Sequence, residues 1–102
     1  MIMRKGNVYH CWVFDIMPHS TYDVKANHYP KSQAMFENVS IYVTGPCYVQ
    51  FHDTNQDKIP IFEDEESLTV SNFRFRKLFI TNETDNIITV RVVLYSKNEL
   101  PA

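Results

Sequence analysis

The sequence predicts an all-β protein, and three observations support this fold class. β-Branched residues are abundant, because Val, Ile and Thr contribute 10, 8 and 7 of the 102 residues. Ala and Leu, which favour helices, number only 3 and 4, and aromatic residues make up 14%. Branched and aromatic side chains suit a pleated sheet. Seven or eight short segments separated by turn residues then indicate an antiparallel two-sheet sandwich of jelly-roll or immunoglobulin-like topology.

The first predicted strand runs from Val8 to Ile16 and is apolar on both faces. Trp12 and Phe14 fall on one face, whereas Tyr9 and Val13 fall on the other. Such a strand is either buried on both sides or packs against another chain.

The segment from Met17 to Asn38 has no sustained periodicity and is predicted to be irregular, with room for a short helix at Ser32 to Phe36. About twenty irregular residues are uncommon in a compact domain, and such a segment is usually a functional loop, a partner-binding arm or a missed element. Its apolar anchors indicate that it packs on the rest of the molecule. These anchors are Tyr22, Val24, Tyr29, Met35 and Phe36.

The remaining strands are predicted from alternating apolar and polar residues at 39–44, 47–52, 58–62, 68–80 and 88–94. Within 68–80 the apolar parity changes, which indicates a bulge or a break near Lys77. Pro60 cannot donate a ladder hydrogen bond, so its strand is expected at a sheet edge. In the last strand, Val93 and Tyr95 make the second face apolar, which predicts a central position or a contact surface.

Length and composition predict a single β-sandwich domain over residues 1–102. The formal net charge of −2 provides no global basic field for nucleic acid. No apolar run approaches the roughly 20 residues that span a bilayer, so no membrane partner is expected. The first residues do not have the form of a signal peptide, because His10 and Asp15 interrupt the apolar stretch. Cys11 and Cys47 are therefore expected to be reduced.

No residue pattern predicts catalysis, a cofactor or a metal site. The His and Cys residues form no His-x-His, His-x-x-x-His or Cys-x-x-Cys, and His52 and Asp53 are adjacent, so they point to opposite faces of a strand. Neither a Gly-x-Ser-x-Gly motif nor a glycine-rich phosphate loop occurs. The acidic run 63–66 is expected to be a solvated turn. Basic residues within 73–79 alternate with phenylalanines as in an ordinary amphipathic strand, so no nucleic acid is expected.

Several strands look apolar on both faces, although a sandwich of this size buries only one face of each sheet. The surplus must be covered by the N-terminal segment or by another subunit, since a standard interface buries about 800 Å² per partner. Tyr42 and Tyr48 lie on the polar sides of two successive predicted strands, so they could line one glycan-binding patch; exposed aromatics equally mark protein interfaces. The candidate interface residues are Tyr9, Val13, Tyr42, Tyr48, Val93 and Tyr95.

Three stretches carry a resemblance to a known group of proteins: IYVTGPCYVQFHD at 41–53, FRFRKLFITN at 73–82 and IITVRVVLY at 87–95. Over roughly residues 39–96 the pattern resembles small β-sandwich structural proteins of tailed-phage particles. The resemblance implies a virion protein, made in the host cytoplasm, that acts in head decoration, head–tail connection, or a tail or fibre. Its partners would be itself and other virion proteins. It carries over no catalytic residues, and residues 17–38 have no counterpart in it.

The expected function is therefore a non-enzymatic, self-associating structural component of a phage particle. The alternative is a carbohydrate- or host-surface-binding β-sandwich module. A small cupin-type enzyme is the weakest hypothesis, because its metal ligands do not occur at a recognisable spacing. Fold alone does not decide among these functions.

Overall fold

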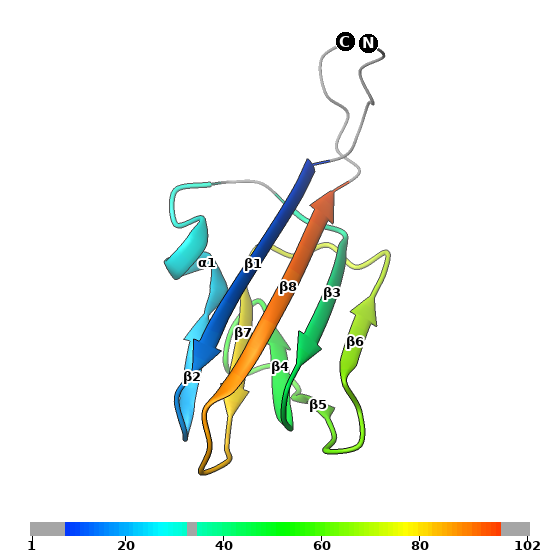
Figure 1. The fold of residues 1–102 in the computed structure, drawn as a ribbon. Helices are drawn as coiled ribbons and strands as arrows, with labels where there is room; N and C mark the ends of the chain where they lie inside the picture. The colour runs from blue at the N-terminus through cyan, green and yellow to red at the C-terminus, as the bar shows by residue number, and fades with distance from the viewer. Residues whose placement is uncertain (1–7, 33–34, 97–102) are drawn as a thin grey trace, which may run out of the picture.

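The computed structural model describes residues 8–32 and 35–96, and of residues 8, 9, 95 and 96 it describes only the backbone. The described residues form eight strands and one short helix (Figure 1). The elements are β1 (Val8–Ile16), β2 (Ser20–Asp23), α1 (Val24–His28), β3 (Asn38–Val43), β4 (Cys47–Phe51), β5 (Ile59–Ile61), β6 (Ser67–Val70), β7 (Leu78–Asn82) and β8 (Ile88–Ser96). The prediction of an all-β fold with seven or eight strands is confirmed.

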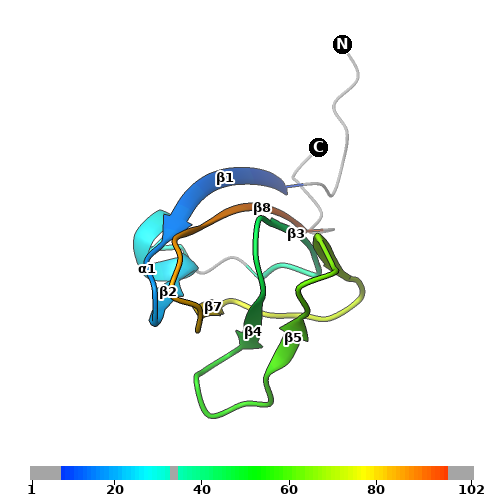
Figure 2. The ribbon, with the colours of Figure 1, turned by 60° about the horizontal axis from the view of Figure 1, so that its bottom comes forward.

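Two antiparallel four-stranded sheets form the sandwich. Sheet A has the order β1-β8-β3-β6 and sheet B the order β2-β7-β4-β5, and Figure 2 shows them as two layers. β1 pairs with β8, β2 with β7, β3 with β6 and β4 with β5, so the chain is one long hairpin folded around a common core. Of the two predicted topologies, this strand order is that of a jelly roll.

The core lies between the sheets and is built from the side chains whose alternation predicted an inward face. Val92 and Leu94 of β8 approach it from sheet A, and Leu78 and Ile80 of β7 from sheet B, all fully buried. Burying each such side chain stabilises the fold by about 1.5 to 3 kcal/mol. β8 is central in its sheet and β5, with Pro60, is an edge strand, as predicted.

The segment predicted to be irregular contains regular structure at its beginning. β2 occupies Ser20–Asp23, and α1 follows directly. The Oδ1 of Asp23 accepts a hydrogen bond from the N–H of Ala26 at 3.0 Å and so caps the helix. Val24 is fully buried, which explains why this short helix stays against the sheets.

The described part of residues 32–36, where the sequence left room for a short helix, is not helical. Phe36 instead forms an isolated antiparallel bridge with Phe75, and residues 33 and 34 lie outside the described residues. Tyr29 and Phe36 are buried, so the segment fills the core as its apolar anchors predicted. Phe75 belongs to the stretch 71–77, which was predicted as strand but only connects β6 of sheet A to β7 of sheet B. The break predicted near Lys77 is confirmed, because β7 begins at the next residue.

Asn82, the last residue of β7, joins two connections at one end of the sandwich. Its side chain is fully buried at the end of β7. The Nδ2 lies 3.1 Å from the carbonyl of Ile16 and 2.7 Å from that of Asn86. The Oδ1 accepts from the N–H and the hydroxyl of Thr84, at 2.9 and 2.7 Å. One amide therefore binds the end of β1 to the turn before β8, and its polar atoms are satisfied although buried.

Candidate functional site

The outer face of sheet A carries exposed apolar side chains that the sequence singled out. The strand register places Val13 beside Arg91 and Arg91 beside Tyr42. Val13 is 64% and Tyr42 41% exposed. The next row contains Cys11, which is exposed, and Val93, which is half-buried. We name this surface face A: Cys11, Val13, Ser40, Tyr42, Arg91 and Val93.

The charged groups on this side of sheet A are engaged by their neighbours. The guanidinium of Arg91 lies over the ring of Tyr42, with Cζ 4.5 Å from the ring centroid. Asp15 accepts a hydrogen bond from the hydroxyl of Thr89 at 2.7 Å. Between these pairs a shallow pocket of about 270 Å³ includes Val13 in its lining. Face A therefore combines the exposed apolar side chains of Cys11 and Val13 with Tyr42, Arg91 and a hydrogen-bonded rim.

Tyr9 and Tyr95 were also predicted to belong to the interface. They are opposite each other in the ladder between β1 and β8, one row beyond Cys11 and Val93. Their side chains lie outside the described residues.

Tyr48 does not join face A. The expectation that Tyr42 and Tyr48 line one patch is wrong, because β3 belongs to sheet A and β4 to sheet B. The chain crosses between the sheets at Gly45, where a Cβ atom would lie 2.9 Å from the Cγ2 of Ile88. A short connection that usually returns within one sheet here changes sheets, so the two tyrosines point to opposite sides of the sandwich.

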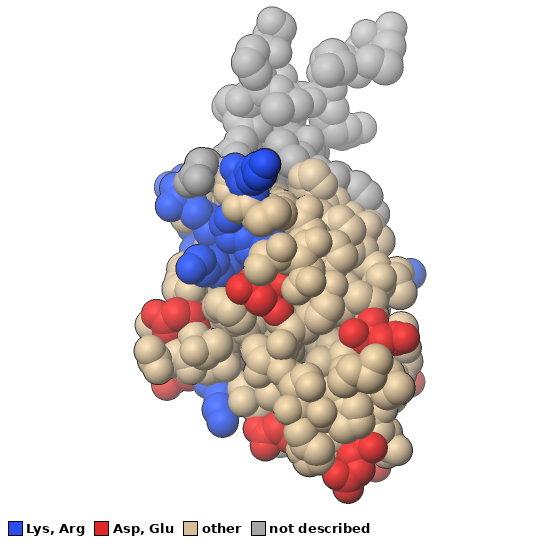
Figure 3. Space-filling model, turned by 90° about the vertical axis from the view of Figure 1, so that its left-hand side faces the viewer, with Lys and Arg blue, Asp and Glu red and all other residues tan. Residues whose placement is uncertain are grey.

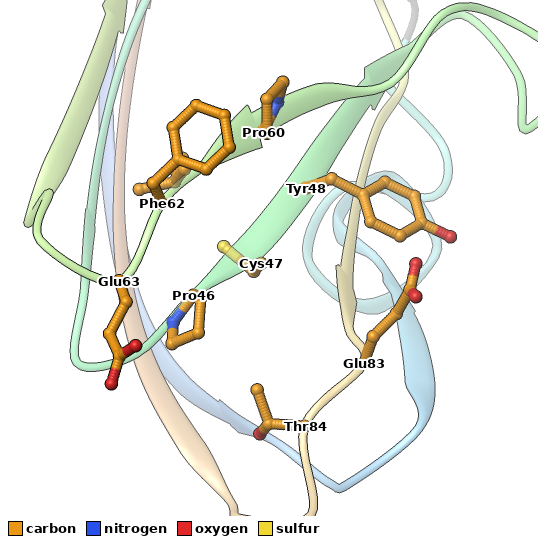
Figure 4. Close-up of a pocket in the computed structure, with 9 residues that line it drawn as sticks. Pro46, Cys47, Tyr48, Pro60, Phe62, Glu63, Glu83 and Thr84 are labelled. Atoms are coloured by element: carbon orange, nitrogen blue, oxygen red, sulfur yellow. The ribbon is translucent and has the colours of Figure 1, made fainter.

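Tyr48 instead borders a second surface hollow, the Tyr48 pocket, of about 300 Å³. Figure 4 shows Tyr48 and Glu83 on one side and Phe62 and Pro60 on the other. Phe62 is 61% exposed. The pocket is lined by Pro46, Cys47, Tyr48, Pro60, Ile61, Phe62, Glu63, Glu83 and Thr84.

A cation and two carboxylates surround this apolar pocket. The Nζ of Lys58 lies 4.4 Å from the ring centroid of Tyr48 and 3.9 Å from the Oε1 of Glu83. Glu63 provides the second carboxylate of the lining. The pocket therefore combines aromatic surface with hydrogen-bond acceptors.

Cys47 lies buried in the lining of the Tyr48 pocket. Desolvation raises the pKa of its thiol to about 11, because burial disfavours the charged thiolate. The thiolate is the nucleophilic form of cysteine. Cys47 is thus a small core residue, as its parity with Val49 and Phe51 predicted.

The other residues weighed for chemistry lie in exposed turns: β4 ends at Phe51, so His52 and Asp53 are in the turn after it and not on a strand. His52 and Asp53 are both exposed, and Glu65 accepts the N–H of Phe62 at 2.8 Å, which closes the acidic turn on itself. Among the described residues, no three His, Cys, Asp or Glu side chains gather closely enough to hold a metal ion. No helix in the described part of the chain has the length and apolarity to cross a membrane.

An aromatic stack that the sequence did not reveal covers the inner side of β1. The ring of His28 stacks on Trp12 at 4.8 Å, and its Nε2 lies 2.8 Å from the hydroxyl of Tyr22. Tyr22 stacks in turn on Phe14 at 3.9 Å. Desolvation lowers the pKa of His28, which favours the neutral ring. The partners come from β1, β2 and α1, so no single periodic pattern contains them.

The strand order defines a jelly-roll β-sandwich with two candidate sites, face A on sheet A and the Tyr48 pocket on sheet B. In comparisons with protein-family models, curated proteins and solved structures, the chain has no significant match. Jelly rolls occur in viral capsid proteins, lectin domains and cupins, so the fold does not select one function. The choice depends on face A and the Tyr48 pocket.

Proposed function

We propose that this protein is a non-enzymatic structural protein that associates with copies of itself through face A, as a component of a phage particle. One observation carries the proposal: Val13 and Tyr42 are 64% and 41% exposed and lie on the same sheet face. Scattered exposed apolar residues are normal, whereas Val13 and Tyr42 flank Arg91 in one row and line the same pocket, as residues of an interaction surface do.

The position of β1 supports self-association. The sequence left two alternatives for this strand, burial on both sides or packing against another chain. In the described structure β1 is an edge strand whose outward Cys11 and Val13 are exposed. Because no described residue buries that side, we infer that β1 packs against another chain there.

Assignment to a phage particle relies on the resemblance over residues 39–96 and on the jelly-roll topology, which is common in viral capsid proteins. The partners would be copies of this chain and other virion proteins. Self-association of identical chains usually ends in closed symmetric assemblies. A decorated shell, a connector or a tail component is built from such repeated contacts.

A carbohydrate- or host-surface-binding module is the second candidate, and the Tyr48 pocket favours it. Sugar rings stack on aromatic faces such as those of Tyr48 and Phe62, and carboxylates such as Glu83 accept hydrogen bonds from sugar hydroxyls. This function would use sheet B and leave face A free.

Tyr42→Ala and Tyr48→Ala separate the two candidates, because each tyrosine lies under a cation on a different sheet. We expect wild-type protein to be oligomeric in native mass spectrometry and sedimentation. Tyr42→Ala should weaken this association at least tenfold, and Tyr48→Ala should leave it unchanged. A wild-type chain that stays monomeric at its solubility limit contradicts self-association. A glycan-array signal that Tyr48→Ala removes and Tyr42→Ala keeps establishes the second candidate instead.

A further inference from the structure

The sheet edges of this sandwich are unequal. An edge strand presents unpaired N–H and C=O groups that another chain can bond, and short strands or prolines blunt such edges. β2 and β6 each have four residues, and β5 has three with Pro60 in the middle. β1 has nine residues, no proline and only one Asp, Glu, Lys or Arg, namely Asp15. β1 is therefore the one long edge without these protections among the described strands.

Hydrogen bonds on the far side of β8 show which way its backbone groups point. The N–H of Thr44 donates to the carbonyl of Thr89 at 3.1 Å. Thr89 therefore directs its backbone groups toward β3, and the other odd-numbered residues of β8 do the same. Successive residues of a strand direct these groups to opposite sides, so the even-numbered residues of β8 bond to β1.

The pairing of β1 with β8 then determines which way the backbone groups of β1 point. Val92 lies opposite Trp12, so the even-numbered residues of β1 direct their N–H and C=O groups to β8. The odd-numbered residues Cys11, Val13 and Asp15 then direct theirs to the open edge. None of these three takes part in a backbone hydrogen bond outside the strand ladders of the described chain. The groups available for another chain thus belong to the strand that also supplies Cys11 and Val13 to face A.

The side chains near this edge suit a copy of the same strand. Figure 3 looks at this side of the sandwich: Lys and Arg gather mainly toward the top, Asp and Glu are scattered from beside them to the lower end, and most of the remaining surface is uncharged. In an antiparallel pair of β1 strands centred on Trp12, the two Asp15 side chains are six residues apart, about 20 Å at about 3.3 Å per residue. That exceeds the Debye length of about 8 to 10 Å in physiological salt, so like charges do not oppose the pairing.

We propose that a second copy of this chain pairs antiparallel with β1, giving a two-fold dimer in which the two A sheets become one continuous sheet. An antiparallel pair of identical strands is self-complementary, as a two-fold interface requires. Cys11 of each copy lies opposite Val13 of the other, and the two copies of face A become neighbours. The inference rests on the proposed self-association and specifies one of its contacts.

Val13→Pro tests the pairing without disturbing the chain's own ladder. Proline removes the N–H of residue 13, which points to the open edge, and it tolerates an edge position. Val13→Thr is the matched control, because it retains both the N–H and a β-branched side chain. We expect sedimentation to show dimer affinity at least tenfold weaker for Val13→Pro and nearly unchanged for Val13→Thr, with equal circular dichroism spectra.

Cross-linking gives a second readout that does not depend on the proline variant folding. On the paired strands the two Cys11 side chains are diagonal neighbours, about 7 to 8 Å apart. A short bifunctional thiol reagent should therefore join wild-type chains into covalent dimers, and Cys11→Ser should abolish this product. Absence of a Cys11-linked dimer overturns edge pairing.

The outcomes separate this inference from the proposed function. A wild-type oligomer whose mass and cross-linking are unaltered by Val13→Pro overturns edge pairing and leaves association through face A standing. A wild-type chain that is monomeric throughout overturns both. Loss of the dimer in Val13→Pro together with its retention in Val13→Thr supports β1 pairing.

Discussion

Outward-facing residues of the two sheets differ in polarity and in exposure. On sheet B the outward Gln50 and Thr81 are polar, yet they are only 3% and 6% exposed; on sheet A the outward Val13 is apolar and 64% exposed. The loop between β4 and β5 explains part of the difference. The Nε2 of Gln50 donates to the carbonyls of Thr54 and Gln56, at 2.9 and 2.8 Å, and Figure 2 shows this loop on the side of sheet B away from sheet A.

The difference shows which sheet face the described residues cover and which they leave exposed. Around Gln50, sheet B is covered by a loop of its own sequence, which the buried Gln50 amide holds. Sheet A receives no such cover from the described residues, although Val13 on its outer side is apolar and 64% exposed. A surface of this kind is expected to be buried by another chain. The following predictions test whether the two faces differ in this way.

The largest expected effect is on thiol reactivity, because Cys11 is exposed on face A and Cys47 is buried in β4 of sheet B. With a pKa of about 11, Cys47 is about one-thousandth thiolate at pH 8, and its burial blocks the reagent further. In the Tyr42→Ala variant, which leaves face A open, we expect iodoacetamide to label Cys11 at least a hundredfold faster than it labels Cys47. Intact-mass measurement should show one added group at pH 8 and a second only as the pH approaches 11.

Two variants control the labelling. Cys11→Ser should take up no group in the native state and one group after unfolding in urea. Two labels appearing at similar rates in folded protein would contradict the buried position of Cys47. Slower labelling of Cys11 in the wild type than in Tyr42→Ala would show that association covers face A.

Gln50→Ala should have the next largest effect, because it removes the amide that holds the covering loop. Two loop carbonyls lose the donor that the buried Gln50 supplies, and we expect the free energy of unfolding to fall by about 2 kcal/mol, roughly thirtyfold in the folding equilibrium. Gln56→Ala is the matched control, since the bond uses the backbone carbonyl of Gln56. Urea unfolding should show that control within about 0.5 kcal/mol of wild type. Equal losses in both variants would mean that the amide does not hold the loop.

This loop also shows how far sequence reasoning extends. Periodicity predicted β1 at Val8–Ile16, the edge position of Pro60 and the break near Lys77, because each depends on local alternation or on a missing donor. It could not predict that β3 and β4 join different sheets, because alternation indicates which face of a strand is buried and does not indicate which strand pairs with it. Gln50 therefore looked like an ordinary solvent-facing residue, although a loop four to six residues away buries it.

The candidate site was predictable only in part, for the same reason. Val13, Tyr42 and Val93 were identified from their parity, and the structure brings them together on sheet A. Tyr48 has the same local signature as Tyr42 but lies on the other sheet, so the single patch expected from both does not exist. The stack around His28 and the helix capped by Asp23 arise from contacts between short elements, and a four- or five-residue element leaves too few residues for a period to show.

The smallest expected effect comes from the two cations that lie over tyrosine rings at nearly equal distances. Arg91 is 4.5 Å from the ring centroid of Tyr42 on sheet A, and Lys58 is 4.4 Å from that of Tyr48 on sheet B. An exposed cation–π contact contributes about 0.5 to 1 kcal/mol, so Arg91→Gln and Lys58→Gln should each lower stability by about that amount in urea unfolding. Their effects on sedimentation should differ, because Arg91 is part of face A and Lys58 is on the opposite side: Arg91→Gln is expected to weaken association severalfold, and Lys58→Gln to leave it unchanged. If both variants change association equally, the two faces do not differ in function, and the apolar exposure of sheet A has no bearing on assembly.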